Sequence, residues 1–204
     1  MTDPETFLAV LRARRSVRSF LDTPVEMGVL KKLVEAAAWA PSAGARQDWE
    51  FTVVTAPEVK MRMVEAVRAR WNTLLEENEG SSADVLREYA GNFDWFAAAP
   101  AIVAVSAART ESFLQHLLQD NAVLVAGRIA SAAMAAQNLM LAAHACGLGS
   151  CCLTGPLAAH EALMEILQLG KRRQLVCLIA LGYPAAQPSP PARKPLEQIM
   201  RIIA

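Results

Sequence analysis

Three short, mainly apolar runs constrain most strongly what this chain can fold into. The longest, Leu175–Gly182, contains no charged residue, and the other two are Trp49–Val54 and Pro100–Ser106. Short, mainly apolar runs bounded by turn residues are typical of strands that are buried on both faces. We therefore predict three buried strands, with Leu175–Gly182 in a central position.

Helical patterns fill most of the sequence between these runs. Asp3-Pro4-Glu5 combines an N-cap acid with a first-turn proline, which is typical of a helix start. Apolar residues at helical spacing predict the remaining helices. The predicted helices run from Asp3 to about Arg14, from about Glu26 to Trp39, from Pro57 to a polar surface break at Glu76–Ala83, over Ser82–Ala90, over Glu111–Ala145 with a break near Asp120, and over His160–Leu169. Five prolines after Tyr183 predict an extended arm, and Leu196–Ile203 closes the chain.

The predicted helix Glu111–Ala145 carries alanine at many of its inward positions. Small side chains allow close packing, so this helix is a candidate for the central core or for a subunit interface. An internal helix of one domain explains the pattern equally well. Gln137 and Asn138 interrupt the apolar stretch, which is rich in alanine rather than leucine, so we interpret it as a buried helix and not a membrane span.

Composition limits the size and the partners of the fold. The chain has 204 residues, 53% of them hydrophobic, and no linker divides it, so we expect a single domain over residues 1–204. The 20 basic side chains balance 20 acidic ones, which argues against bulk attraction to nucleic acid or to an anionic membrane. The first five residues are acidic and lack the basic region of a secretory signal, so we expect a cytoplasmic protein.

The four cysteines show no C-x-x-C spacing, and the three histidines form no ligand pattern with them. We therefore expect no structural metal and reduced thiols. Cys152 is a possible nucleophile, but no base lies near it in the sequence, and a packed cysteine is the more common situation. Whether the cysteines have a redox role stays open at this point.

Positive charge is concentrated near the N-terminus. Arg12, Arg14, Arg15 and Arg18 fall within seven residues of a chain whose net charge is +0. Guanidinium groups bind phosphate through forked, charge-assisted hydrogen bonds, and the Ser16 hydroxyl adds a donor, so a local anion site is one interpretation. A solvated helix end is another, and a contact with RNA or an acidic partner is a third.

Two segments are poor in side-chain bulk and rich in turn residues. Pro41–Gln47 would let backbone amides approach a ligand closely, although an ordinary helix-to-strand connector has the same composition. Gly147–Pro156 follows a helix and lacks the G-x-G-x-x-G spacing, so it is not a dinucleotide fingerprint. We interpret it as a helix end followed by turns.

Four segments, taken in order, resemble the nitroreductase-like family of FMN-dependent oxidoreductases over nearly the whole chain. They are Arg14–Phe20, Ala40–Trp49, Ala136–Leu139 continuing through Gly147–Cys151, and Leu181–Pro184 followed by Arg193–Leu196. The resemblance implies an α+β fold, with a mainly antiparallel central sheet flanked by helices in an intertwined homodimer. It also implies FMN as cofactor and NAD(P)H as co-substrate.

The resemblance assigns residues to the flavin. The phosphate and ribityl chain would be held by Arg14, Arg15, Ser16, Arg18 and Arg193. The ring would be lined by Pro41, Ser42 and Ala43 of the partner chain, and Leu153, Thr154 and Gly155 would present backbone N–H groups to its N5/O4 edge. Two positions depart from the family, which often has asparagine at Ala45 and proline at Asp48.

The implied activity is reduction of electron-poor small molecules, namely nitroaromatics, quinones or enones, by a ping-pong hydride transfer. No catalytic side chain is expected, because the cofactor performs the hydride chemistry. A flavin-binding or regulatory protein without turnover is the alternative, as is a variant chemistry such as reductive dehalogenation. The physiological acceptor and the choice between NADH and NADPH are not determined by these motifs.

Overall fold

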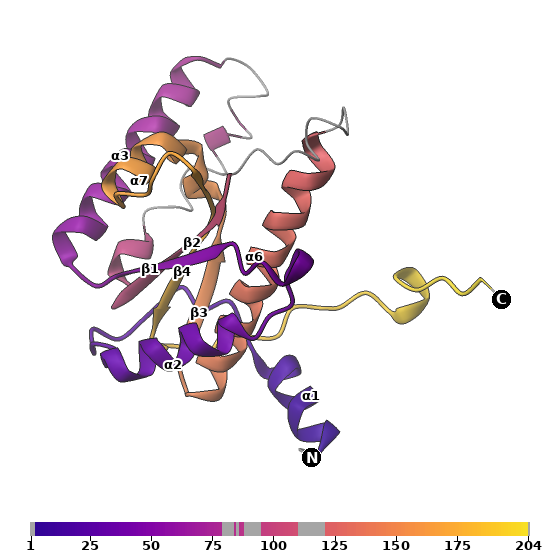
Figure 1. Cartoon of the computed structure of the whole chain (residues 1–204). Helices are drawn as coiled ribbons and strands as arrows, with labels where there is room; N and C mark the ends of the chain where they lie inside the picture. The colour runs from indigo at the N-terminus through magenta and orange to yellow at the C-terminus, as the bar shows by residue number, and fades with distance from the viewer. Residues whose placement is uncertain (1–2, 79–83, 85, 88–94, 110–120, 204) are drawn as a thin grey trace.

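A four-stranded antiparallel sheet forms the centre of the protein in a computed structural model (Figure 1). The structure describes residues 3–78, 84, 86–87, 95–109 and 121–203. The strands are β1 (Trp49–Val54), β2 (Ala101–Ala108), β3 (Gly149–Leu153) and β4 (Arg173–Gly182), in the order β1-β2-β4-β3. The predicted α+β class and the central position of β4 are confirmed.

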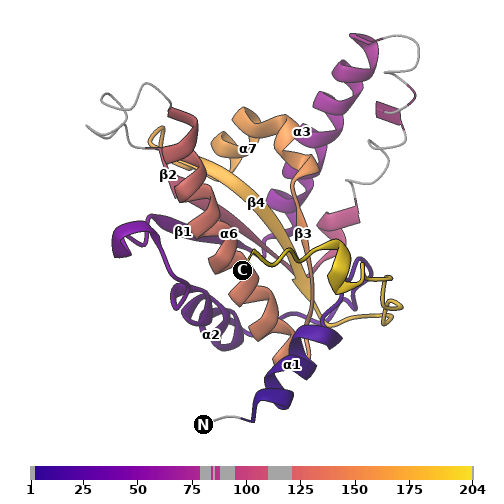
Figure 2. The ribbon, with the colours of Figure 1, turned by 90° about the vertical axis from the view of Figure 1, so that its right-hand side faces the viewer.

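Helices cover both faces of this sheet. The α-helices are α1 (Pro4–Ala13), α2 (Met27–Ala38), α3 (Pro57–Glu76), α6 (Asn121–Ala145) and α7 (His160–Ile166), and short 3-10 turns are η1 (Ala43–Ala45), η2 (Trp95–Ala98), η3 (Gly155–Ala159) and η4 (Leu196–Gln198). Figure 2 shows α2 and α6 on one face and α3 and α7 on the other. The helix predicted over Ser82–Ala90 and the first part of the one predicted over Glu111–Ala145 lie largely outside the described residues.

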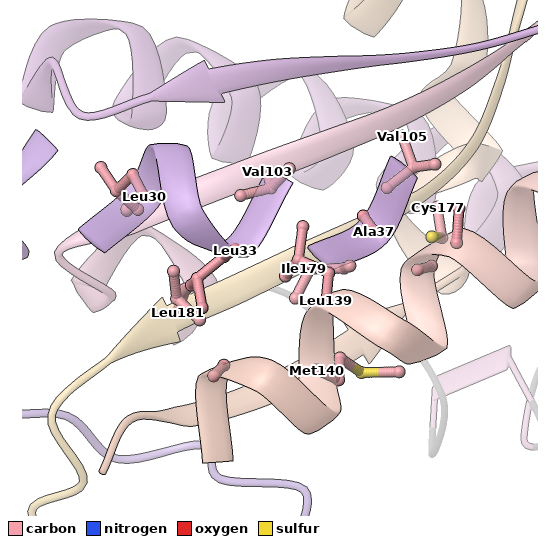
Figure 3. Close-up of a cluster of buried hydrophobic side chains, with 14 of the residues drawn as sticks. Leu30, Leu33, Ala37, Val103, Val105, Leu139, Met140, Cys177, Ile179 and Leu181 are labelled. Carbon is pink, nitrogen blue, oxygen red and sulfur yellow. The ribbon is translucent and has the colours of Figure 1, made fainter. Parts of the chain in front are cut away.

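The two-sided cover explains why β4 is a continuous apolar run. Successive side chains of a strand point to opposite faces. Cys177, Ile179 and Leu181 enter the core under α2 and α6 (Figure 3), whereas Leu178 and Ala180 enter the core under α3 and α7. All of them are at most 3% exposed, so no position along this part of β4 is available to a polar side chain.

The alanine-rich helix α6 packs in the first of these cores. Ala132, Ala136, Leu139 and Ala143 are buried against α2 and the sheet. The Asn138 amide lies 3.5 Å from the Ala36 carbonyl of α2, which links the two helices directly. The alanine-rich face of α6 therefore packs inside a single chain, which is one of the explanations that the sequence left open. Among the described helices, none is long and apolar enough to cross a membrane.

The prediction that Gly147–Pro156 consists only of a helix end and turns is wrong. Gly147 does follow α6 with φ +76°, but Gly149–Leu153 then forms edge strand β3, paired with β4 from Gly149↔Gly182 to Leu153↔Leu178. The strand is short and begins with glycine and serine, so its own sequence carries little β signal. Its partner β4, which is distant in sequence, determines its conformation.

The two ends of the chain are the second departure from expectation. Apolar residues of α1 share a helical face, yet no residue of α1 is buried, and Phe7 is 56% exposed. Beyond Pro184 the arm is extended as predicted, but its last part forms only η4 and projects away from the body (Figure 1). Ile202 and Ile203 are 77% and 83% exposed.

Candidate functional site

The basic segment Arg14–Phe20 is held along the β3 edge of the sheet. The Val17 N–H donates to the Ser150 carbonyl at 3.0 Å, and Ser16 forms an isolated parallel bridge with Ser150. Further along, the Leu21 N–H donates to the Tyr183 carbonyl at 2.9 Å. Val17 is buried, so it anchors the segment while its polar neighbours remain at the surface.

Close packing makes this attachment specific. A Cβ added to Gly149 would lie 2.7 Å from the Val17 Cβ, and one added to Gly182 would lie 2.4 Å from the Pro100 Cδ. Both distances are too short for a real contact. Glycine at position 149 therefore allows the close approach of Val17, and glycine at position 182 leaves room for Pro100 and for the Phe20 ring, whose Cδ1 would lie 3.1 Å from an added Cβ.

The C-terminal arm returns to this same segment and closes a pocket with it. The pocket has a volume of about 340 Å³. Its lining residues are Arg14, Arg15, Ser16, Arg18, Pro188, Ser189, Pro191 and Arg193. The structure thus brings together all five residues that the sequence proposed for a phosphate group, from opposite ends of the chain. Pro188, Ser189 and Pro191 were not predicted as site residues, because only the folded path of the arm places them here.

The charge of this arginine pocket is not balanced from within. Four of its lining residues are arginines and none is acidic. Arg15 Nη1 donates to the Arg12 and Arg14 carbonyls at 2.6 and 2.8 Å, whereas Arg14, Arg18 and Arg193 form no ion pair in the described part of the chain. Like charges at close range raise the free energy of the empty pocket, and an anion would lower it. The arrangement is suited to a phosphate or a comparable anion.

A buried thiol lies beside the pocket. Burial raises the pKa of Cys151, while the positive charges of Arg18 and Arg14 and a hydrogen bond with Ser16 act in the opposite direction. The Cys151 side chain is therefore a neutral packing group near the arginines. Cys152 is exposed, so the interpretation of that residue as a packed cysteine is wrong.

The loop Pro41–Gln47 lies outside the arginine pocket of its own chain. Ser42 Oγ accepts from the Gln47 N–H at 3.0 Å, and the Ala43 N–H donates to Ser131 Oγ of α6 at 3.3 Å. Gly44, Ala45 and Gln47 all have positive φ. The loop is thus fixed in an unusual conformation, and the prediction that Pro41, Ser42 and Ala43 act in a second chain remains a prediction.

The departure at Asp48 has a structural role. Its carboxylate lies 3.6 Å from Arg128 Nε of α6, and Arg128 Nη1 donates to the Ala108 carbonyl at 3.1 Å. A side-chain ion pair therefore connects the start of β1 to α6 at this position, where a proline would have no charge to offer.

Leu153, Thr154 and Gly155 lie where β3 ends and η3 begins. The Leu153 side chain is buried in the core under α3 and α7, which fixes the backbone at this point, and Thr154 is exposed. This turn ends β3, the edge strand of the sheet, and the basic segment that lines the arginine pocket is bridged to the start of the same strand at Ser150. An elongated ligand with an anionic end could extend from one to the other along that edge. In the described residues, no group of three or more His, Cys, Asp or Glu side chains could hold a metal ion.

Comparison with known proteins gives consistent matches over almost the full length. The sequence profile of the Nitroreductase family matches residues 11–183. A protein named NADH dehydrogenase from Thermus thermophilus is 33% identical, and the alignment covers 92% of this chain and 91% of that protein. A 4-nitrobenzoate reductase from Nocardioides sp. is 31% identical, with 90% and 82% covered.

Solved structures share the fold. A BluB-like flavoprotein from Clostridium difficile superposes with a TM-score of 0.84 at 24% identity, covering 97% of this chain and 98% of that one. An iodotyrosine deiodinase bound to FMN and 3-iodo-L-tyrosine superposes with a TM-score of 0.72 at 21% identity, covering 97% of both chains. At these identities the superpositions establish the fold alone.

Proposed function

This chain belongs to the nitroreductase family, and from that premise we propose that it is an FMN-dependent oxidoreductase that passes hydride from NAD(P)H to an electron-poor acceptor. The observation that carries the proposal is the arginine pocket, in which residues from both ends of the chain surround one site for an anion. The proposal assigns that site to the FMN phosphate.

The residues present suit a flavin mononucleotide. Arg14, Arg18 and Arg193 would hold the phosphate through charge-assisted hydrogen bonds, with Arg15 and Ser16 completing the contact with the phosphate and ribityl chain. Leu153, Thr154 and Gly155 follow along the same sheet edge, and their backbone N–H groups would face the N5/O4 edge of the ring. When bound, the flavin would supply the hydride-accepting and hydride-donating chemistry. The chain would bind it, orient it and place donors where negative charge accumulates.

A second copy of the chain is part of the proposal. Both chain ends carry exposed apolar residues, including Phe7 and Leu11 of α1 and Ile199, Ile202 and Ile203 of the arm, and Trp39 after α2 is also exposed. Apolar surface of this extent favours a protein interface. An intertwined homodimer would cover these residues and bring Pro41, Ser42 and Ala43 of one chain to the flavin of the other.

The substrates proposed are small electron-poor molecules. NAD(P)H and the acceptor would use one open site in turn, in a ping-pong cycle. Similarity to the 4-nitrobenzoate reductase favours a nitroaromatic acceptor over a quinone or enone. The fold shared with the deiodinase keeps reductive dehalogenation as the second candidate, and iodotyrosine is the compound that tests it.

The proposal is tested by FMN binding and anaerobic reduction. Purified protein should bind FMN saturably, and NADH or NADPH should bleach the flavin band within seconds. Adding 4-nitrobenzoate should then restore the band. Flavin binding without bleaching by either nucleotide would indicate a binding protein without turnover. If no saturable FMN binding is found, the proposal fails, and the arginine pocket would then be assayed for RNA or an acidic protein partner.

A mixing experiment tests the shared site. Arg14→Glu disables the phosphate side and Ala43→Asp the partner side, so each variant alone should have no intact site. A mixed dimer has one intact site and one doubly altered site. Random reassociation makes half of the dimers mixed, so mixing the two variants after mild unfolding should restore FMN binding to about a quarter of the original level, whereas no recovery would contradict a site built from two chains.

A further inference from the structure

Two of the cysteines are neighbours on adjoining strands. Cys152 of β3 is paired with Ile179 of β4, and Cys177 lies two residues before Ile179. Residues two apart on a strand point to the same face, so Cys152 and Cys177 share the face that α2 and α6 cover. Their thiol groups are hydrogen-bonded to each other.

The two thiols differ in exposure. Cys177 is 3% exposed and packs in the core beneath Val105 and Ala37 (Figure 3). Cys152 is exposed at the free edge of the sheet. One thiol is therefore accessible to a reagent, and the second is held against it from the protein interior.

The local charges favour reaction at the exposed thiol. The hydrogen bond from Cys177 lowers the pKa of Cys152, and the positive charge of Arg14 acts in the same direction, whereas partial desolvation of the thiol by its neighbours acts against them. The same hydrogen bond and burial raise the pKa of Cys177. Cys152 is thus the sulfur that becomes the thiolate, which is the nucleophilic form of the side chain.

We propose that Cys152 is a modification site for hydroperoxides, and that its oxidation ends in a disulfide with Cys177. The Cys152 thiolate attacks one oxygen of hydrogen peroxide, the O–O bond breaks, and a sulfenic acid and hydroxide form. The Cys177 sulfur, giving up its proton, then attacks the Cys152 sulfur. The S–S bond forms, the S–O bond breaks and water leaves. Two thiols are oxidised by two electrons, and one peroxide is reduced to two waters.

The disulfide would move the end of β3. Diagonal neighbours on adjoining strands have Cα atoms about 7–8 Å apart, and a disulfide usually needs less than about 7 Å. Closing the bond therefore draws Cys152, the penultimate residue of β3, toward β4. Thr154 and Gly155 follow directly, so oxidation should also alter the flavin spectrum; this consequence, unlike the disulfide itself, rests on the proposed function.

The test uses the full chain as purified, treated with a small excess of hydrogen peroxide, alkylated after unfolding and mapped by mass spectrometry. The expected result is the loss of two thiols, a peptide joining Cys152 to Cys177, and reversal by dithiothreitol. The Cys152→Ser variant should lose no thiol under the same conditions. The Cys177→Ala variant should accumulate a dimedone-reactive sulfenic acid at Cys152. The Cys146→Ser variant should behave as the unmodified chain does, since Cys146 is exposed but lies after the end of α6.

Three results would overturn the proposal: oxidation that begins at Cys146, a disulfide between Cys151 and Cys152, or a Cys152 that reacts only after unfolding. The Cys152→Ser variant changes an exposed residue, so its result stays informative even if the Cys177→Ala variant fails to fold. The mass readout needs no flavin, so failure of the proposed function would leave this test intact.

Discussion

The centre of the molecule and its two chain ends differ in how far their apolar side chains are buried and their charged side chains are paired. Around β4 the side chains are buried on both faces, and charges are paired where the sheet ends, as with Arg173, which lies 3.6 Å from Glu50 and donates to Ser106 Oγ at 3.2 Å. In α1 and the arm, apolar side chains are exposed, and four arginines from the two ends of the chain line one pocket. The side chains of the centre are packed within one chain. The ends instead expose apolar and basic side chains, as surfaces that bind a ligand or another protein do.

The largest effect expected from this contrast concerns the arm. Removing residues 196–204 leaves every lining residue of the arginine pocket in place but deletes three exposed isoleucines. If a second chain covers them, each contributes roughly 1.5–3 kcal/mol to association. We expect the truncated chain to sediment as a monomer at micromolar concentration while keeping its thermal unfolding cooperative. A full-strength dimer after truncation would place the interface elsewhere.

A substitution in the centre should lower the free energy of unfolding and leave association between chains unaffected. Ile179 is 0% exposed and Ile203 is 83% exposed. Ile179→Ala should lower the free energy of unfolding by about 2–5 kcal/mol, because it leaves a cavity that the two-sided packing cannot close. Ile203→Ala is the matched control and should leave the urea midpoint of the isolated chain unchanged. Equal effects of the two variants on that midpoint would contradict the view that the centre is tightly packed and the chain end is not.

The arginine pocket should show a smaller and ligand-dependent effect. Arg14→Ala and Arg193→Ala should each weaken FMN binding by about 1.5–3 kcal/mol, or roughly 10- to 150-fold in Kd, since each removes charge-assisted hydrogen bonds. The controls are Arg12→Ala, whose side chain pairs with Glu5 at the surface at 3.2 Å, and Lys194→Ala beside the pocket. Fluorescence titration measures all four, and losses of equal size in the controls would show that only general charge matters.

The smallest expected effect is a pH dependence inside the centre. Lys60 is 8% exposed and donates to the Ala99 carbonyl at 2.6 Å, and burial lowers its pKa from 10.5. Between the lowered pKa and 10.5 the unfolded chain binds more protons than the folded one, so stability should rise with pH over that interval. Lys60→Met should flatten this rise, measured by urea unfolding at several pH values. Lys31→Met, at an exposed position of α2, should leave it unchanged.

The strands of the centre were largely predictable, because a segment that is buried on both faces must consist mainly of apolar residues. The run at Leu175–Gly182 is apolar at every position, which only a strand covered on both faces requires, and Trp49–Val54 matches β1 at both boundaries. Strand β3 was not predictable in this way. Its five residues, Gly149–Leu153, are extended because β4 supplies the pairing groups, and that pairing is made between segments far apart in the chain.

By itself, the sequence determined which segments are buried, where most helices begin and end, and which residues carry chemistry suited to phosphate. These follow from side-chain hydrophobicity, local backbone preference and charge, which act over a few residues. Only the tertiary structure decided that Pro188, Ser189 and Pro191 line the pocket with the arginines, that Cys152 lies against Cys177, and that the apolar face of α1 is left uncovered. Each of these depends on contacts between distant segments, whose positions are set by the packing of the whole sheet.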